Sequence, residues 1–128
     1  IGLCLVGSEM CIRDRFGGGW RQAGVLAAAC LYALDHHVDR LADDHRRAKR
    51  IAEMMNELPM FTVDMATVQT NMIYAETVEP AADVVAKYAE NGIDMFDLSP
   101  HRLRVVVHLH ITDDDVERFT EVSRRLFG

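Results

Sequence analysis

Two arginines stand at positions where a guanidinium could bind an anion. Arg104 lies within the apolar run 102–111, and a charge in such a run needs a partner. The partner is either an internal Asp or Glu, or a substrate carboxylate that arginine binds through two parallel hydrogen bonds. Arg21 follows the glycine run 17–19 at the start of a helical pattern, which is typical of a phosphate-binding loop. The Walker spacing is absent, and a glycine triplet alone also serves as a hinge.

The histidines form a second group with possible chemistry. His108 and His110 are two residues apart on one expected strand face, which would suit two metal ligands. His36, His37 and His45 lie in a helical region rich in aspartate. Neither HExxH nor CxxC spacing occurs, so the sequence favours surface or packing roles for these imidazoles and predicts no metal site.

Cysteine and lysine limit the nucleophilic chemistry. Cys4, Cys11 and Cys30 are an odd set without a paired spacing, which indicates a reducing compartment. Cys30 falls in an apolar helical stripe and is expected in the core. Lys49 and Lys87 are the only lysines, so any chemistry that needs an amine must use one of them.

The elements that must position these groups follow from periodicity. A helix is expected from Trp20 to about Leu34, a break at 35–37 and a second helix over 38–58. The apolar stripe of the first helix consists of Val25, Leu26, Ala29, Cys30, Ala33 and Leu34.

The second half of the chain predicts a small sheet with helices. Strands are expected at 67–76, 93–96 and 102–111, the last with alternating apolar residues on one face. Helices are expected from Pro80 to Asn91-Gly92 and from Thr112 onward. The fold class is therefore α/β, in an α+β-like form: a small, mainly antiparallel sheet covered by helices.

Composition excludes several classes of function. The 128 residues carry a formal charge of −6 and no extended basic run, which argues against nucleic-acid binding. The longest uncharged stretch, residues 22–34, is too short to span a membrane.

Residues 1–15 look like translated adapter sequence and are set aside as non-native. This leaves a glycine loop and long helical segment at 16–58 and a small C-terminal domain at 59–128.

Three segments together resemble one family. They are GGGWRQAGVLAAACLYALDHHVDRLADDH, VQTNMIYAE and RLRVVVHLHIT. In this order they are similar to the C-terminal part of low-specificity L-threonine aldolases, which are fold-type I enzymes dependent on pyridoxal 5'-phosphate. Trp20, Val107 and His110 stand where usual members have Met, Thr and Asp.

The resemblance implies a carbon–carbon lyase that cleaves L-threonine or L-allo-threonine to glycine and an aldehyde. It places Arg104 at the carboxylate of the amino-acid substrate and Arg21 near the cofactor phosphate. The family's lysine lies upstream of the glycine loop, so no catalytic residue is carried over and the 128 residues alone are expected to be an inactive fragment. A cytoplasmic homo-oligomer, dimer or tetramer, is implied for the longer protein.

Two alternatives stay open. One is another fold-type I enzyme with the same cofactor, of the β-eliminating or serine hydroxymethyl type. The other is a free-standing small-molecule-binding or interaction module, which would leave no large apolar patch exposed. The fragment interpretation instead predicts exposed apolar helix faces around Leu26 to Leu34.

Overall fold

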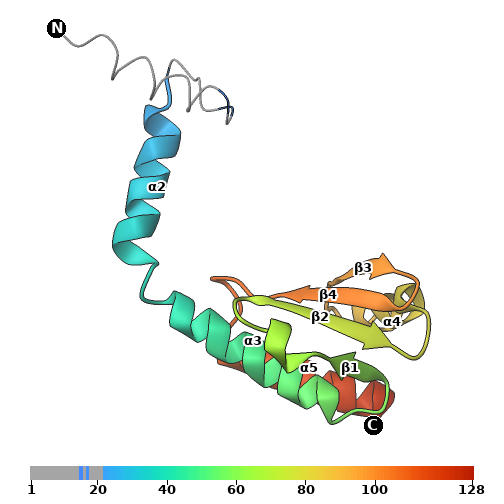
Figure 1. The fold of residues 1–128 in the computed structure, drawn as a ribbon. Coiled ribbons are helices and arrows are strands. Elements are labelled where there is room, and N and C mark those ends of the chain that lie inside the picture. Colours follow the sequence, from blue (N-terminus) through green and yellow to red (C-terminus); the bar gives the residue numbers. More distant parts are fainter. Residues whose placement is uncertain (1–14, 16, 18–21) are drawn as a thin grey trace, which may run out of the picture. The chain divides into compact units, whose positions relative to one another are not determined.

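The computed structural model describes Arg15, Gly17 and residues 22–128. The chain divides into two compact units, Ile1–Val38 and Asp39–Gly128. The second unit contains the whole sheet and the helices that pack on it (Figure 1). Because no described helix is both long and apolar enough, none could cross a membrane.

The first unit contains one described helix, α2 (Gly24–His36). A break separates α2 from the next helix, but it lies at 37–40, slightly later than the predicted 35–37, because α2 continues through His36. The expected buried stripe is wrong, because none of the α2 residues is buried and Cys30 is exposed. No described part of the unit covers the helix, so its large apolar side chains face solvent. These are Val25, Leu26, Leu31, Tyr32 and Leu34.

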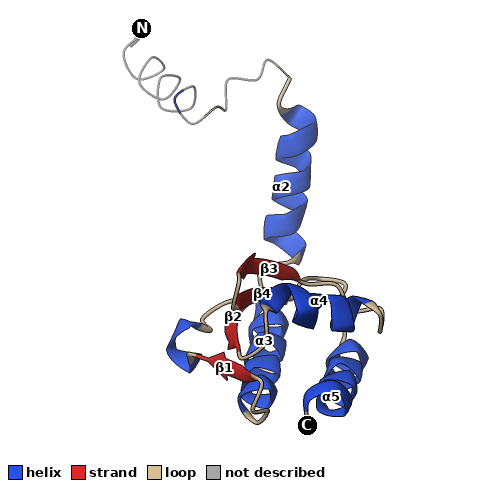
Figure 2. Cartoon of the chain, turned by 90° about the vertical axis from the view of Figure 1, so that its right-hand side faces the viewer, coloured by secondary structure: helices blue, strands red, loops and turns tan. Residues whose placement is uncertain are grey.

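The second unit contains a four-stranded antiparallel sheet. Its strands are β1 (Phe61–Val63), β2 (Met72–Thr77), β3 (Phe96–Ser99) and β4 (Arg102–Val106). Their order is β1-β2-β4-β3, and each neighbouring pair is antiparallel (Figures 1 and 2). The predicted α/β class and small antiparallel sheet are confirmed.

Three helices accompany the sheet: α3 (Leu41–Asn56), α4 (Ala81–Ala89) and α5 (Asp113–Phe127). Each carries an apolar stripe at helical spacing, and the stripes meet the apolar face of the sheet in one core. Tyr88 lies at its centre, stacked on Phe119 with ring centroids 5.3 Å apart. Other core side chains come from every layer, including Ile51, Met55, Ile73, Ala75, Val84, Leu103, Val107 and Val116.

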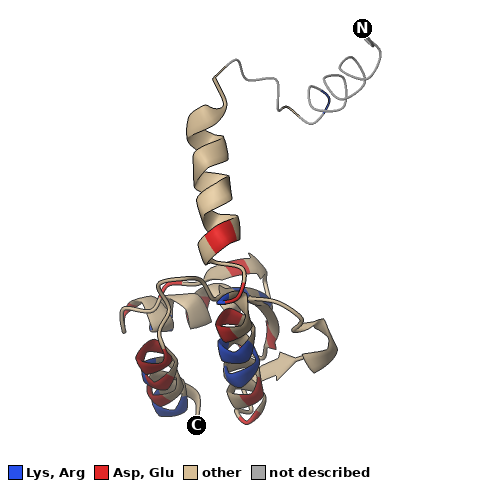
Figure 3. Cartoon of the chain, turned by 90° about the vertical axis from the view of Figure 1, so that its left-hand side faces the viewer, with Lys and Arg blue, Asp and Glu red and all other residues tan. Residues whose placement is uncertain are grey.

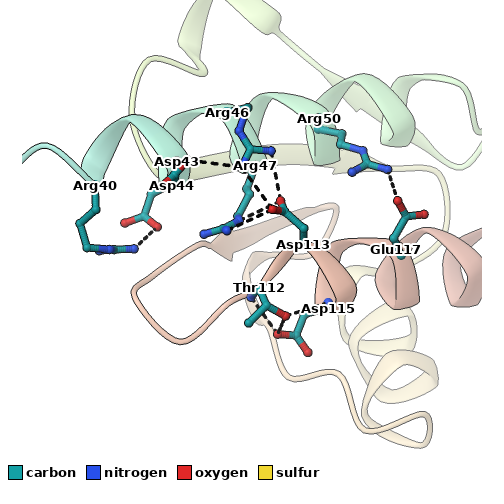
Figure 4. Close-up of polar contacts among 10 residues, drawn as sticks. All are labelled: Arg40, Asp43, Asp44, Arg46, Arg47, Arg50, Thr112, Asp113, Asp115 and Glu117. Carbon is teal, nitrogen blue, oxygen red and sulfur yellow. Dashed lines mark hydrogen bonds and ion pairs between the residues drawn. The ribbon is translucent and has the colours of Figure 1, made fainter.

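The helix ends follow local sequence signals. Thr112 caps α5 in a reciprocal arrangement with Asp115, whose carboxylate accepts hydrogen bonds from the Thr112 backbone and hydroxyl (Figure 4). These hydrogen bonds lower the pKa of Asp115. Beyond α4, Gly92 adopts φ +71°, where a side chain would be strained, as the Asn91-Gly92 pair predicts.

The strand boundaries differ from the predicted ones. The short strand β1 was not predicted, and the Asn56 amide completes its edge by bonding both the N–H and the C=O of Val63. Strand β3 lies three residues beyond the expected 93–96. Strand β4 ends at Val106 instead of residue 111. The next residue, Val107, still donates its N–H to the Asn71 carbonyl, but its own carbonyl accepts from the Asn71 side-chain amide, so the regular ladder ends there.

A row of ion pairs joins helices α3 and α5 side by side, and Figure 4 shows those of Asp113 and Glu117. The two helices run parallel, because the three bridging pairs all have the same sequence separation of 67 residues. Figure 3 shows acidic and basic residues along both helices. The three pairs are Arg46–Asp113, Arg50–Glu117 and Glu57–Arg124.

Asp113 is the centre of this row. Its carboxylate accepts hydrogen bonds from Arg47 at 3.0 Å and from Arg46 at 3.1 Å. Arg47 therefore faces α5, whereas Asp43 approaches Arg46. The hydrogen bonds from Arg47 and Arg46 hold the pKa of Asp113 well below its usual range.

We expect Asp113→Asn to lower the melting temperature at pH 7 more than at acidic pH. The pKa of Asp113 is lower in the folded chain than the value of about 3.9 in an unfolded one. Its stabilisation is therefore present above pH ~4 and is lost as the pH falls. Thermal unfolding at pH 7 and pH 3 measures this, with Asp114→Asn as control, since Asp114 makes no ion pair among the described residues. A gap between parent and Asp113→Asn that stays constant with pH would contradict the account.

Candidate functional site

The sheet has one covered and one open face. Residues that alternate along β2 and β4, such as Ile73 and Leu103, are fully buried against the helices. The residues between them point to the other face, because successive side chains of a strand alternate. The register places Tyr74, Arg104 and Phe96 in one row across β2, β4 and β3. Arg104 is therefore at the middle of the open face, on a strand paired on both sides.

The guanidinium of Arg104 lies over an aromatic ring and has no polar partner among the described residues. Its Cζ atom is 5.6 Å from the centroid of the Phe96 ring, within the range of a cation–π interaction. Its Nε atom is buried without a hydrogen-bond partner. No carboxylate among the described residues forms an ion pair with it. Of the two partners that the sequence left open for Arg104, the described residues supply no internal Asp or Glu.

The neighbouring arginine on the same face differs in one respect. Arg102 lies over the Tyr74 ring, with Cζ 5.1 Å from the centroid. It also forms an ion pair with Glu76, with Nε and Oε1 3.4 Å apart. The open face thus carries two arginine–aromatic pairs, of which only one has a carboxylate. A buried, unpaired donor is costly, so the Arg104 side chain suits an anionic ligand with two oxygen acceptors.

The histidines are placed differently from the prediction. His108 and His110 lie in the turn after β4 and are exposed, so the expected strand-face pair is wrong. The His110 backbone N–H approaches His108 Nδ1 at 3.3 Å. His36 Nδ1 is 2.9 Å from the carbonyl oxygen of Tyr32. Within the described part of the chain, no three His, Cys, Asp or Glu residues are grouped to hold a metal ion.

A cavity of about 370 Å³ lies beside this turn, between the end of β4 and the start of α5. Its polar rim includes His108, His110, Asp94, Asp115 and Arg118. Two of these groups already have partners, since Asp115 caps α5 and the Arg118 guanidinium donates to the Asn91 carbonyl. The floor is apolar and contains Ile51, Ile93, Val107 and Phe119. The cavity therefore offers no unpaired donor comparable with Arg104.

The remaining predicted groups do not gather at Arg104. Arg21 and the glycines at 18–19 lie outside the described residues. The Lys87 amine is held by the Glu79 carboxylate at 2.6 Å and lies over the Phe127 ring. Lys49 is exposed on α3. Sequence reasoning missed Phe96, whose only signal is its place on a short strand before the Ser99-Pro100 turn.

Comparison with known proteins relates this chain to a described family. The sequence matches the family described as beta-eliminating lyase over residues 5–78, which is more than half of its length. The chain belongs to the beta-eliminating lyase family. This confirms the family resemblance inferred from the three motifs.

Two curated relatives are described as threonine aldolases. The chain is 36% identical to the probable low-specificity L-threonine aldolase 2 of Arabidopsis thaliana, over 99% of the chain and 39% of that protein. It is 34% identical to the low-specificity L-threonine aldolase of Escherichia coli K12, over 91% of the chain and 35% of that protein. The chain thus spans between a third and two fifths of the length of these relatives.

Solved structures show the same fold. A complex of the cystine C–S lyase C-DES with its product cysteine persulfide superposes with a TM-score of 0.63 at 18% identity, over 83% of this chain and 29% of that one. A C-DES variant with glycine covalently linked to its PLP cofactor gives 0.63 at 19% identity. The chain therefore has the fold of part of a fold-type I enzyme, and pyridoxal phosphate is the cofactor of this group, as the resemblance implied.

Proposed function

We propose that this chain is part of a pyridoxal-phosphate-dependent lyase that cleaves L-threonine or L-allo-threonine to glycine and acetaldehyde. The observation that carries the proposal is Arg104, an arginine on a central strand whose Nε is buried without a partner. The substrate class is supported by relatives at 34–36% identity that are described as threonine aldolases. The likeness to the cystine lyase, at 18% identity, supports the fold alone.

In this proposal, Arg104 binds the α-carboxylate of the amino acid through two parallel hydrogen bonds. Because β4 is paired on both sides, the guanidinium is anchored on a fixed backbone and orients the substrate at Cα. When bound, pyridoxal phosphate supplies the electron sink for the carbanion that cleavage leaves at Cα. Binding of the carboxylate at Arg104 thus fixes the position of the Cα–Cβ bond that is cleaved.

The described residues fit the substrate carboxylate but not the attachment of the cofactor. Lys87 is paired with Glu79, and Lys49 is exposed on a helix at no described cavity. Neither amine is therefore available in a protected site. Arg21 remains the proposed contact of the cofactor phosphate. We propose that the 128 residues alone are inactive and that the attachment lysine belongs to the rest of a longer protein.

We also propose that the longer protein is a homo-oligomer and that it is located in the cytoplasm. Helix α2 supports an association surface, because it is apolar and exposed on all sides. A helix that is apolar all round is normally buried. The alternative of a free-standing binding module is less well supported, since it predicts no large exposed apolar patch.

A substrate panel tests this function. We expect the longer protein, loaded with pyridoxal phosphate, to convert L-threonine and L-allo-threonine to acetaldehyde and equimolar glycine. The 128-residue chain serves as the negative control in the same assay. L-Serine and L-cystine separate the alternatives, because a β-eliminating enzyme would release a 2-oxo acid and ammonia from them. Faster turnover of L-cystine than of L-threonine, or robust cleavage by the 128 residues alone, would contradict the proposal.

A further inference from the structure

Phe96 is an exposed aromatic residue with one notable neighbour. Its side chain is 64% exposed on the edge strand β3, where a large apolar group gains little from burial. The sheet register places it directly beside Arg104, and its ring centroid is 5.6 Å from the Arg104 Cζ atom. The ring therefore supports a charged group and is not part of the core.

We infer that Phe96 is a positioning residue that holds the Arg104 guanidinium ready to bind a carboxylate. This inference rests on the proposed function, which makes that carboxylate the one of an amino-acid substrate. A cation over an aromatic face is attracted without using its N–H groups, so they stay free to donate to two oxygens. A flexible arginine would have to be ordered on binding, and the ring reduces that entropic cost.

The neighbouring pair on the same face shows the complete arrangement. Arg102 lies over Tyr74 and is also paired with the Glu76 carboxylate. Arg104 has the same aromatic support but no carboxylate, and its Nε is buried without a partner. The external carboxylate would take at Arg104 the role that Glu76 takes at Arg102. The Arg104–Phe96 pair thus lacks only a carboxylate, which the ligand would supply.

Titration with acetate, the simplest carboxylate, tests this inference without catalysis. The ¹⁵N-labelled 128-residue chain is titrated at pH 6, and the Arg104 Nε–H signal, assigned by its loss in Arg104→Lys, reports binding. We expect a saturable shift in the parent and a dissociation constant about threefold to tenfold higher in Phe96→Leu, which keeps an apolar side chain but removes the aromatic face. Phe96→Tyr restores the aromatic face and should stay within about twofold of the parent.

The matched control is Leu98→Ala, which removes another exposed apolar side chain from the same strand. It should leave acetate binding unchanged, and the backbone amide spectrum shows that each variant is folded. An unchanged dissociation constant in Phe96→Leu, an equal loss in Leu98→Ala, or no shift in the parent would overturn the inference. Failure of the proposed function appears separately, as absence of threonine cleavage by the longer protein while acetate binding still depends on Phe96.

Discussion

Arg104→Lys in the longer protein should raise the KM for L-threonine by about 10-fold to 100-fold. The lysine amine keeps the positive charge but cannot present two parallel N–H groups to a carboxylate. Hydrogen bonds to charged groups contribute roughly 1.5–3 kcal/mol each, which corresponds to this range. Steady-state kinetics measured over a wide range of threonine concentration give the KM and kcat separately.

The control for this variant is Arg102→Lys. Arg102 lies on the same strand and the same face, and its charge is already paired with Glu76. Its replacement should leave the KM for threonine within about twofold of the parent, since it loses only an exposed ion pair. An equal rise in KM for both variants would indicate a general effect of charge on this face and would remove Arg104 as the carboxylate site.

Tyr88→Ala should destabilise the second unit by about 3–5 kcal/mol, as expected for removal of a large aromatic side chain from a core. Tyr88 is fully buried and lies between two other aromatic rings, with Phe119 stacked at 5.3 Å and Phe127 tilted at 5.5 Å. Burial raises the pKa of its hydroxyl to about 12, so the side chain stays neutral in ordinary buffers. Urea unfolding followed by circular dichroism measures the loss.

Tyr88→Phe separates the ring from its hydroxyl. The hydroxyl forms a 2.7 Å hydrogen bond with Ser123 Oγ, which also donates to the Phe119 carbonyl at 2.7 Å. Ser123 therefore keeps a partner when the tyrosine hydroxyl is removed, and we expect a loss of only about 1 kcal/mol. If Tyr88→Ala were no more destabilising than Tyr88→Phe, Tyr88 could not be the centre of this core.

The helices could be predicted from sequence because their signals are local. The Thr112 cap and the stripe of Val116, Phe119 and Val122 define α5 without knowledge of any other element. The strand ends depend on distant residues, which sequence periodicity does not contain. Apolar alternation continues beyond Val106, but β4 ends there because the Asn71 side-chain amide, in place of a backbone N–H, takes the Val107 carbonyl. The three-residue β1 is likewise completed by the Asn56 side chain and not by a run of its own.

In the candidate site, too, only the features with a local sequence signal could be predicted. Arg104 could be selected from sequence because a charge within an apolar strand is unusual. Phe96 could not, because its relation to Arg104 depends on the register between β3 and β4. The pairing of Arg102 with Glu76 also depends on register, and this pairing distinguishes the two arginines of the open face. The stripe on α2 was correctly identified as apolar, but periodicity cannot show whether a partner covers it.

A crystal structure of the longer protein with pyridoxal phosphate and glycine bound would show which residue binds the substrate carboxylate. We expect the glycine carboxylate to lie within about 3 Å of the Arg104 guanidinium, with both oxygens accepting hydrogen bonds. Phe96 should then still lie against the opposite side of that group. A carboxylate bound by other residues, with Arg104 left on the Phe96 ring without a ligand, would contradict the account.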